Sequence, residues 1–199
     1  MNAAIGSGAD TATVLDPVQS IQMAPRKLEQ LRHLAGSSGE VFHAAVSTVH
    51  ELCILLNDAD ADALAFAREG LERARPLARV ECVEGNVLRG VRSFEKRGPF
   101  DLVMAGGLFD YLSDRQMAFV VSQALRRLLK PGGTLFFTNI ATGNPYRVWI
   151  EYCADWRLIE RSEAEIRSLV AGCFDQALDI EIARDATGLT HLVRVRLAG

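Results

Sequence analysis

The sequence predicts an α/β fold: a doubly wound, mainly parallel sheet with an antiparallel strand near the C-terminus. From Cys53 onward, short apolar runs alternate with stretches of helical periodicity, the pattern of a parallel sheet covered by helices. The apolar runs end in polar residues or glycine, as strands do where they leave a sheet. The last two runs, Asp179–Ala183 and His191–Leu197, are separated by a short turn-forming stretch and predict an antiparallel pair.

The individual elements follow from periodicity and from their end signals. Residues 1–24 are expected to form a flexible leader and residues 25–199 a single domain. Helical spacing of apolar residues predicts helices at Pro25–Leu34, residues 41–52, Asp60–Ala74, Arg115–Leu129, Pro145–Ala154 and Glu163–Ala171. Four short apolar runs predict the parallel strands Cys53–Leu56, Val80–Val83, Asp101–Met104 and Thr134–Thr138.

Composition restricts the class of partner. The chain has 199 residues, 49% of them hydrophobic, and a net charge of −3, which argues against nucleic acid or an anionic membrane as the main partner. The four cysteines and four histidines show no metal-ligand spacing, so no metal is expected. Because no signal peptide or long apolar run is present, we expect a cytoplasmic protein with a small-molecule substrate. A homodimer or a partner subunit stays possible.

The candidate site lies where the predicted strands end, because ligands of open parallel sheets bind outside the carboxyl ends of the strands. The residues at these ends are Asp58 with Ala59, Asn86 with Val87, the pair Gly106-Gly107, and Asn139. A carboxylate in the position of Asp58 suits the two hydroxyls of a ribose, although either Asp58 or Asp60 could instead cap the following helix. Asn86 suits the amino edge of an adenine, or belongs to an ordinary Gly-Asn turn.

Four stretches, in this order and at this spacing, resemble class I S-adenosylmethionine-dependent methyltransferases: "CILLNDADADALAFARE", "VECVEGNV", "PFDLVMAGGLFDYLSD" and "LLKPGGTLFFTN". The resemblance covers roughly Leu52 to Leu197. It implies a Rossmann-like sheet, S-adenosylmethionine as cofactor, and a methyltransferase-like domain over residues 25–199. By position, the resemblance implies that Asp58 binds the ribose hydroxyls, with Ala59 beside it. Asn86 and Val87 would border the adenine. Ala105 and Gly106 would pass beneath the cofactor.

The second part of the third stretch, "AGGLFDYLSD", and a later stretch, "NPYRVWIEYCADWRLIERSE", are similar to bacterial methyltransferases of the extracellular-factor type. That subfamily carries out 3-hydroxypalmitic acid methyl ester biosynthesis, so the resemblance implies a fatty-acid carboxylate as methyl acceptor.

The chain departs from the family in one place. The family has a glycine-rich loop between its first strand and first helix, and no such loop precedes Cys53 at the expected distance. The stretch Gly6-Ser7-Gly8 comes too early, and Thr13–Asp16 is followed by proline where glycines belong. Residues 40–46 lie too close to Cys53 for a parallel crossover. The predicted pocket is therefore complete on its adenosine side only.

The acceptor side is predicted to begin at the glycine pair. Phe109 and Tyr111 would form the pocket wall, with the Tyr111 hydroxyl facing the acceptor and Asp110 capping the helix from Ser113. Alternatively, the glycines only end a strand, and Phe109 and Tyr111 are core. We expect Tyr111 and Asn139 to be the catalytic residues.

A substrate wall is predicted beyond the strand Thr134–Thr138. Aromatic and polar residues gather there: Tyr146, Trp149, Glu151 and Trp156. The alternative is that Trp149, Tyr152 and Trp156 form one packed helix face, with Glu151 in an ion pair with Arg147.

These observations favour an enzyme that methylates a carboxylate or hydroxyl of a small molecule. A carboxylate acceptor needs no general base, which suits a chain without an obvious catalytic dyad. The competing hypotheses are a non-catalytic methyltransferase-like domain that acts as subunit or scaffold, and an enzyme damaged by loss of its first strand. A dinucleotide dehydrogenase is disfavoured, because no GxGxxG follows a strand.

Overall fold

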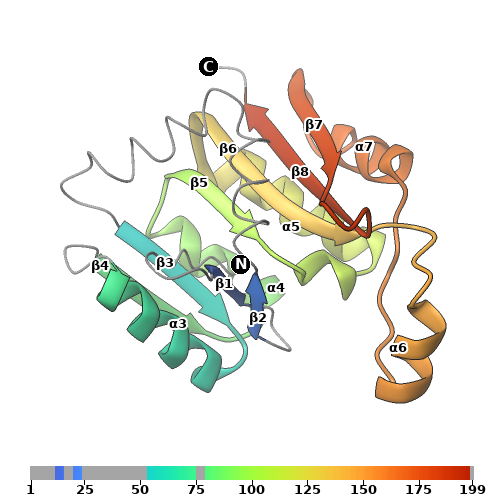
Figure 1. Cartoon of the computed structure of the whole chain (residues 1–199). Helices are drawn as coiled ribbons and strands as arrows, with labels where there is room; N and C mark the ends of the chain where they lie inside the picture. Colours follow the sequence, from blue (N-terminus) through green and yellow to red (C-terminus); the bar gives the residue numbers. More distant parts are fainter. Residues whose placement is uncertain (1–11, 16–19, 24–52, 75–78, 198–199) are drawn as a thin grey trace. The chain divides into compact units, whose positions relative to one another are not determined.

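The computed structural model describes residues 12–15, 20–23, 53–74 and 79–197 (Figure 1). The chain forms two compact units, Met1–Arg92 and Ser93–Gly199, and each is described by itself. The helices predicted at residues 25–34 and 41–52 lie outside the described residues. The leader and the single domain stay predictions.

The first unit contains a parallel strand pair with its crossover helix. Strand β3 (Cys53–Asp58) pairs in parallel with β4 (Arg79–Glu84), so that Asp58 lies opposite Glu84. Helix α3 (Ala61–Ala74) connects them and contacts both strands. Leu56 and Leu64 form the buried apolar cluster with Ala67. Strand β1 (Ala12–Leu15) pairs antiparallel with β2 (Ser20–Met23), and helix α4 (Val87–Glu95) follows β4.

The second unit is built on a four-stranded sheet in the order β5-β6-β8-β7. The strands are β5 (Phe100–Ala105), β6 (Leu129–Ile140), β7 (Leu178–Arg184) and β8 (Thr190–Leu197). Strand β5 is parallel to β6, and β8 is antiparallel to both β6 and β7. Strands β5, β6 and β7 therefore run in one direction and β8 runs against them. This arrangement confirms the predicted fold class, including its antiparallel strand near the C-terminus.

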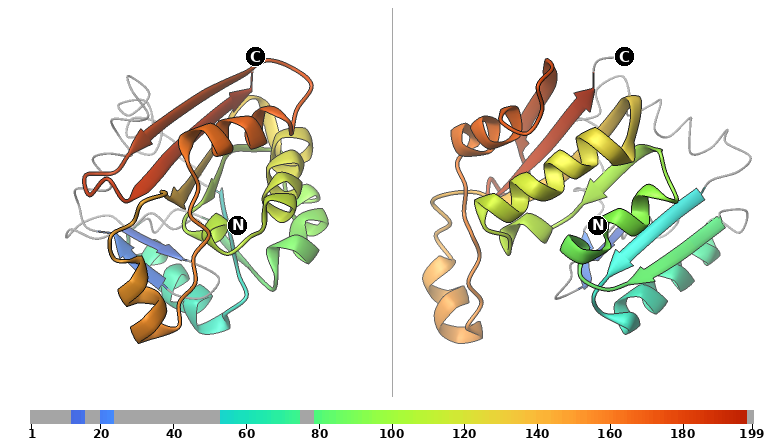
Figure 2. Two further views of the ribbon diagram at one scale, coloured as in Figure 1. Left: turned by 90° about the vertical axis from the view of Figure 1, so that its right-hand side faces the viewer. Right: turned by 180° about the vertical axis from the view of Figure 1, so that it is seen from behind.

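Helices α5 (Asp114–Gln123) and α7 (Glu163–Ala171) lie side by side over one face of this sheet (Figure 2). Strands β6 and β8 pair apolar side chains on one face, Leu135 with Val195 and Phe137 with Val193, and all four are buried. On the other face Phe136 lies opposite Arg194, which pairs with Glu181 of β7. Along these pairs one face is therefore apolar, and the other combines the Arg194–Glu181 ion pair with the buried ring of Phe136.

The sequence "LKPGG" forms the first part of strand β6, directly after the helical segment ends at Leu128. Helix α5 changes at Ala124 into the π-helical turn η2 (Ala124–Leu128), and β6 begins at once. The register between β5 and β6 is interrupted after the pair Phe100–Leu129 and resumes at Leu102–Thr134. The extra residues bulge out, with Gly132 at φ 74°, a conformation that glycine adopts without strain.

Helix α6 (Arg147–Ala154) projects away from the sheet of its own unit (Figure 1). It contains no buried residue. The 3₁₀ turn η1 (Leu108–Asp110) follows β5 and leads into α5.

Candidate active site

The ends of β3 and β4 are fastened together by a buried asparagine. The Nδ2 atom of Asn57 donates to the carbonyl oxygens of Val83 at 2.7 Å and Gly85 at 2.9 Å. The backbone N–H of Gly85 donates to the carbonyl of Asp58 at 2.7 Å. Gly85 has φ 131°, and a side chain built there would meet none of the described residues within 4 Å. The described residues therefore fix the shape of this edge and leave the space above Gly85 open.

Asp58 places a carboxylate at this edge. It is 1% exposed, and one carboxylate oxygen accepts a hydrogen bond from the N–H of Asp60 at 3.0 Å. Burial raises the pKa of Asp58 from its ordinary value, and backbone hydrogen bonds from Asp60 and Ala59 partly offset that rise. A carboxylate acceptor beside an open backbone fits a ribose with two hydroxyl donors.

The helix cap is provided by Asp60. Its carboxylate accepts hydrogen bonds from the N–H groups of Asp62 at 2.9 Å and Ala63 at 3.3 Å, in the first turn of α3. Of the two aspartates that could start this helix, Asp60 therefore satisfies its free N–H groups.

Asn86 and Val87 lie directly after the Gly85 turn. The Oδ1 atom of Asn86 accepts from the N–H of Leu88 at 2.9 Å, so this side chain starts helix α4, as the Gly-Asn turn alternative requires. Val87 is buried at 5% exposure, and Ala59 is exposed. The first unit thus gathers all four predicted adenosine-side residues at one strand edge.

In the second unit, β5 ends at Ala105 and the chain turns at the glycine pair. Ala105 and Gly106 are buried. Gly107 has φ 70°, and its N–H donates to the hydroxyl oxygen of Thr138 at 2.8 Å. One of the two glycines is therefore required by the left-handed backbone of this turn.

Phe109 was predicted to form the pocket wall, with a core position as the alternative. The structure places it in the core. It has 0% exposure, and its ring packs edge-to-face on Phe137 with centroids 4.8 Å apart. A ring without exposed surface holds the turn by packing. The glycine turn therefore directs this side chain inward.

The expectation that Asp110 caps α5 is wrong. One oxygen of Asp110 accepts from the N–H of Ile140 at 2.6 Å and from Asn139 Nδ2 at 2.9 Å. The N-terminus of α5 instead has a capping box, in which Gln116 Oε1 accepts from the Ser113 N–H at 2.9 Å. The Asp110 side chain therefore points back to the end of β6 and not forward to the next helix.

Asn139, predicted to be catalytic, is 0% exposed and bonded within the protein. Besides Asp110, its Nδ2 atom donates to the carbonyl of Ile159 at 2.9 Å. Its Oδ1 atom accepts from Arg161 Nη1 at 2.6 Å. These bonds join the end of β6 to η1 and to the segment after α6, so the structure gives Asn139 a supporting position.

Tyr111 and Trp156 are brought together from 45 residues apart. The indole Nε1 of Trp156 donates to the hydroxyl oxygen of Tyr111 at 2.7 Å. Both side chains are partly exposed. A predicted catalytic residue therefore lies beside a predicted substrate residue.

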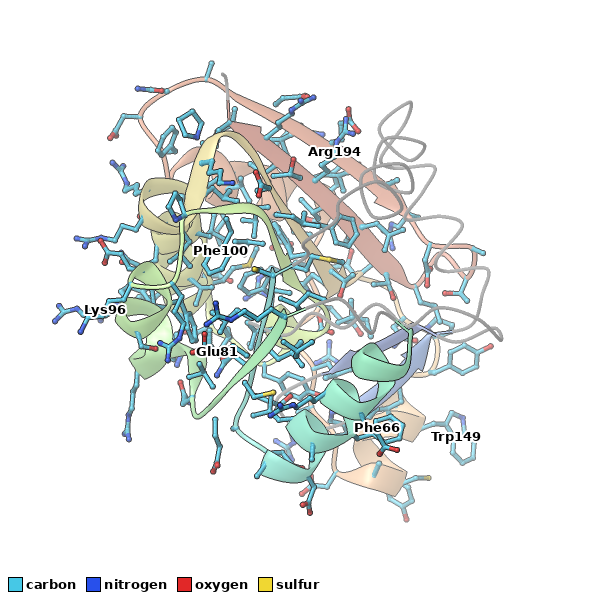
Figure 3. All side chains as sticks on the ribbon, turned by 90° about the vertical axis from the view of Figure 1, so that its left-hand side faces the viewer. Phe66, Glu81, Lys96, Phe100, Trp149 and Arg194 are labelled. Carbon is cyan, nitrogen blue, oxygen red and sulfur yellow. The ribbon has the colours of Figure 1, made fainter. Side chains whose placement is uncertain are left out.

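Of the remaining residues of the predicted substrate wall, the two aromatics are exposed and Glu151 is half-buried. Tyr146 is 58% exposed and Trp149 is 69% exposed, and Figure 3 shows Trp149 pointing outward from α6. Tyr152 is 87% exposed, so these aromatics do not form the packed helix face that was the alternative. Glu151 accepts from Arg147 Nε at 2.8 Å, as the ion-pair alternative requires.

Sequence reasoning missed Arg161, which is 2% exposed and contacts Asn139 and the η1 region. Its partners lie between 22 and 52 residues away in the chain. No local spacing could have indicated them. The only signal is its place directly before the Ser162 capping box.

A family model described as a methyltransferase domain matches residues 31–133, just over half of the chain. The chain belongs to this methyltransferase family. The match confirms the predicted enzyme class, a methyltransferase, and its predicted cofactor, S-adenosylmethionine. It begins 22 residues before Cys53.

Solved structures share the fold of this methyltransferase. The N-methyltransferase NodS from Bradyrhizobium japonicum WM9, in complex with S-adenosyl-L-homocysteine, is 19% identical, with 87% of this chain and 86% of that chain covered and a TM-score of 0.57. Magnesium protoporphyrin IX methyltransferase ChlM from Synechocystis PCC 6803, with bound SAH, is 11% identical, with 86% of each chain covered and a TM-score of 0.56.

A possible exported protein from Bordetella parapertussis is 18% identical, with a TM-score of 0.57. The similarity covers 73% of this methyltransferase and 53% of that protein, so the chain spans about half of its length. No curated protein matches the chain. Across the part of the methyltransferase that the structure describes, no helix is long and apolar enough to cross a membrane.

Proposed function

We propose that this methyltransferase transfers the methyl group of S-adenosylmethionine to a carboxylate or hydroxyl of a small molecule. The observation that carries the proposal is the buried carboxylate of Asp58 at the joined ends of β3 and β4. Burying a carboxylate is costly, as its raised pKa reflects. A charge kept in such a place despite its cost is typical of a binding site.

Different residues of this edge contact the ribose and the adenine of the cofactor. Asp58 accepts the ribose hydroxyls, with Ala59 beside it, and the open space above Gly85 admits the rings. Asn86 and the buried Val87 border the adenine. Because Asn86 Oδ1 already accepts from Leu88, its Nδ2 is the group that faces the base. Ala105 and Gly106 stay proposed cofactor contacts on the strength of the family resemblance.

The acceptor side is assigned to Tyr111 and Trp156, with Tyr146, Trp149 and Glu151 on the α6 side. When bound, S-adenosylmethionine supplies a methyl group on a positively charged sulfur, so an ionised carboxylate can receive it without a general base. The Tyr111 hydroxyl would donate to the acceptor oxygen and orient it. Three exposed aromatic side chains near α6, those of Tyr146, Trp149 and Tyr152, favour an acceptor with a large apolar body.

The finer proposal follows the subfamily resemblance: the acceptor is a 3-hydroxy fatty acid such as 3-hydroxypalmitic acid. This molecule carries both a carboxylate and a hydroxyl, so a single substrate distinguishes the two acceptor types. The purified chain is incubated with 3-hydroxypalmitate and S-adenosylmethionine, and the products are measured by mass spectrometry before and after mild alkali. A methyl ester disappears in alkali and a methyl ether persists.

We expect an alkali-labile methylated product. The Asp58→Asn variant should lose most of this product, and Asp60→Asn, two residues away in a capping position, should retain it. Absence of any methylated product from the wild-type chain would remove 3-hydroxypalmitate as the acceptor.

A further inference from the structure

The segment that returns from α6 is fastened to the turn that carries Tyr111. The indole of Trp156 donates to the Tyr111 hydroxyl, and the N–H of Ile159 donates to the carbonyl of Asp110 at 2.7 Å. The N–H of Arg161 donates to the carbonyl of Ile140 at 3.0 Å, next to a parallel bridge with Ala141. The segment 156–161 therefore contacts the η1 turn and the end of β6 through Trp156, Ile159 and Arg161.

Arg161 contributes the strongest part of this attachment. Its Nη1 donates to the carbonyl of Phe109 at 2.8 Å and its Nη2 to the carbonyl of Leu112 at 2.6 Å. These two carbonyls lie on either side of Tyr111 in the sequence. The guanidinium also donates to Asn139 Oδ1 at 2.6 Å and to Asp114 Oδ1 at 2.9 Å.

The geometry requires an arginine. The side chain is 3% exposed, whereas its carboxylate partner Asp114 is 78% exposed, so much of the buried charge is stabilised by carbonyl and amide oxygens. A guanidinium spreads five donors in a plane and can reach acceptors on several elements at once. A lysine ammonium is a point charge and cannot span the carbonyls of Phe109 and Leu112 together.

We infer that Arg161 is a positioning residue for the acceptor side of the site. It holds the turn 109–112 so that Tyr111 meets Trp156. The indole N–H donates to the Tyr111 hydroxyl oxygen, and this contact holds the hydroxyl beside the indole. The inference rests on the proposed function in placing the methyl acceptor at Tyr111.

The first test reads the turn without any activity. The chain has two tryptophans, so Trp149→Phe leaves Trp156 as the single fluorescent reporter. In that background, Arg161→Lys should shift the Trp156 emission to the red, because the loosened turn releases the indole to water. The matched control is Arg157→Lys, an exposed arginine on the same segment (side chain 82% exposed), which should leave the emission unchanged.

The red shift of the Trp156 emission should depend on the hydrogen bond between Trp156 and Tyr111. Tyr111→Phe removes the indole's acceptor, so Arg161→Lys should add little in a Tyr111→Phe background, as coupled residues require. Should Arg161→Lys fail to fold, Asp114→Asn is the second variant. It removes the carboxylate charge that pairs with the Arg161 guanidinium, so the Trp156 emission should shift to the red by a smaller amount. Folded Arg161→Lys or Asp114→Asn variants with unchanged Trp156 emission would overturn the inference.

The second test separates positioning from general stability. With 3-hydroxypalmitate as acceptor, Arg161→Lys should lower kcat/KM for the acceptor by about tenfold or more, with KM for S-adenosylmethionine nearly unchanged. Equal losses for acceptor and cofactor would mean a merely structural role. If the wild-type chain leaves 3-hydroxypalmitate unmethylated, the proposed acceptor fails, and the fluorescence test still decides the role of Arg161.

Discussion

The carboxyl ends of β3 and β6 each carry a buried asparagine, and the two are built differently. Asn57 fastens β3 to the end of β4 through the carbonyls of Val83 and Gly85. Asn139 fastens β6 to η1 and to the segment after α6. At β3 the charged group is the next residue, Asp58, whereas at β6 it is Arg161, 22 residues further on.

The comparison shows that a polar residue at a strand end is not by itself a ligand group. In both places the asparagine fixes the edge, and the residue that we propose to contact a ligand is another one: Asp58 in the first unit and Tyr111 in the second. The first edge is held mainly by contacts between two strands, and the second by a network that includes a buried cation. The two edges should therefore respond differently to mutation.

The largest expected effect is on the β6 edge. Arg161→Ala leaves the carbonyls of Phe109 and Leu112 and the Asn139 amide oxygen without their donor. Unsatisfied buried groups cost about 1–3 kcal/mol each, so we expect a loss of roughly 3 kcal/mol or more in the free energy of unfolding. Urea denaturation measures it, and a loss below about 1 kcal/mol would show that the network contributes little.

The matching change on the β3 edge should cost less. Asn57→Ala removes two hydrogen bonds to backbone carbonyls, for which we expect a loss of about 1–3 kcal/mol. The variant should also weaken cofactor binding, since the Gly85 turn is no longer held. Urea denaturation and calorimetric titration with S-adenosylhomocysteine check both parts. Unweakened binding in a destabilised Asn57→Ala protein would separate this turn from the cofactor.

His191 gives the β6 edge a pH dependence. It lies opposite Asn139, its Nε2 is 3.1 Å from the carbonyl of Arg161, and burial with the nearby charge of Arg184 lowers its pKa from 6.5. Below about pH 6.5 the unfolded chain takes up the proton that the folded protein resists, so stability should fall as the pH drops from 7.

The slope is at most about 1.4 kcal/mol per pH unit for one such group. His191→Gln retains a donor in that place and should flatten the dependence between pH 7 and 5. Thermal melts across that range measure it, and an unchanged slope in the variant would assign the effect to other groups.

The smallest effect is expected at the cap of α3. Asp60→Ala removes the acceptor for the N–H groups of Asp62 and Ala63 and should cost about 1 kcal/mol in stability. Affinity for S-adenosylhomocysteine should stay within about twofold of wild type. A large loss of affinity would show that the division of roles between Asp58 and Asp60 is wrong.

The sequence was sufficient wherever an arrangement depends on neighbouring residues. Periodicity predicted β3, α3, β4 and α7 to within a residue or two, whereas the role of Asp58 in binding stays a prediction. The sequence was insufficient where the position of a side chain depends on contacts with residues far away in the chain. Nothing near Arg161 predicts a partner 52 residues away, and nothing near Asp110 indicates that its carboxylate turns back to β6.

The aromatic residues show the same limit. Phe109 and Tyr111 are two positions apart in one turn, yet Phe109 is buried against Phe137 and Tyr111 reaches Trp156. Only the left-handed backbone of Gly107 and the packing of the sheet decide which of them turns inward. The residue types alone do not distinguish the buried position of Phe109 from the partly exposed position of Tyr111.

The central claim is that Asp58 holds the ribose of the cofactor, and calorimetric titration of S-adenosylhomocysteine against the wild-type and Asp58→Asn chains tests it most directly. The carboxamide keeps the size of the side chain and its acceptor for the Asp60 N–H. Loss of a charged hydrogen bond should weaken binding by roughly 1–3 kcal/mol, about tenfold or more. Because burial raises the pKa of Asp58, its charge costs stability at neutral pH, and the variant should melt no lower than the wild type. Equal affinity of the two chains, or a variant that binds weakly only because it melts lower, would contradict the claim.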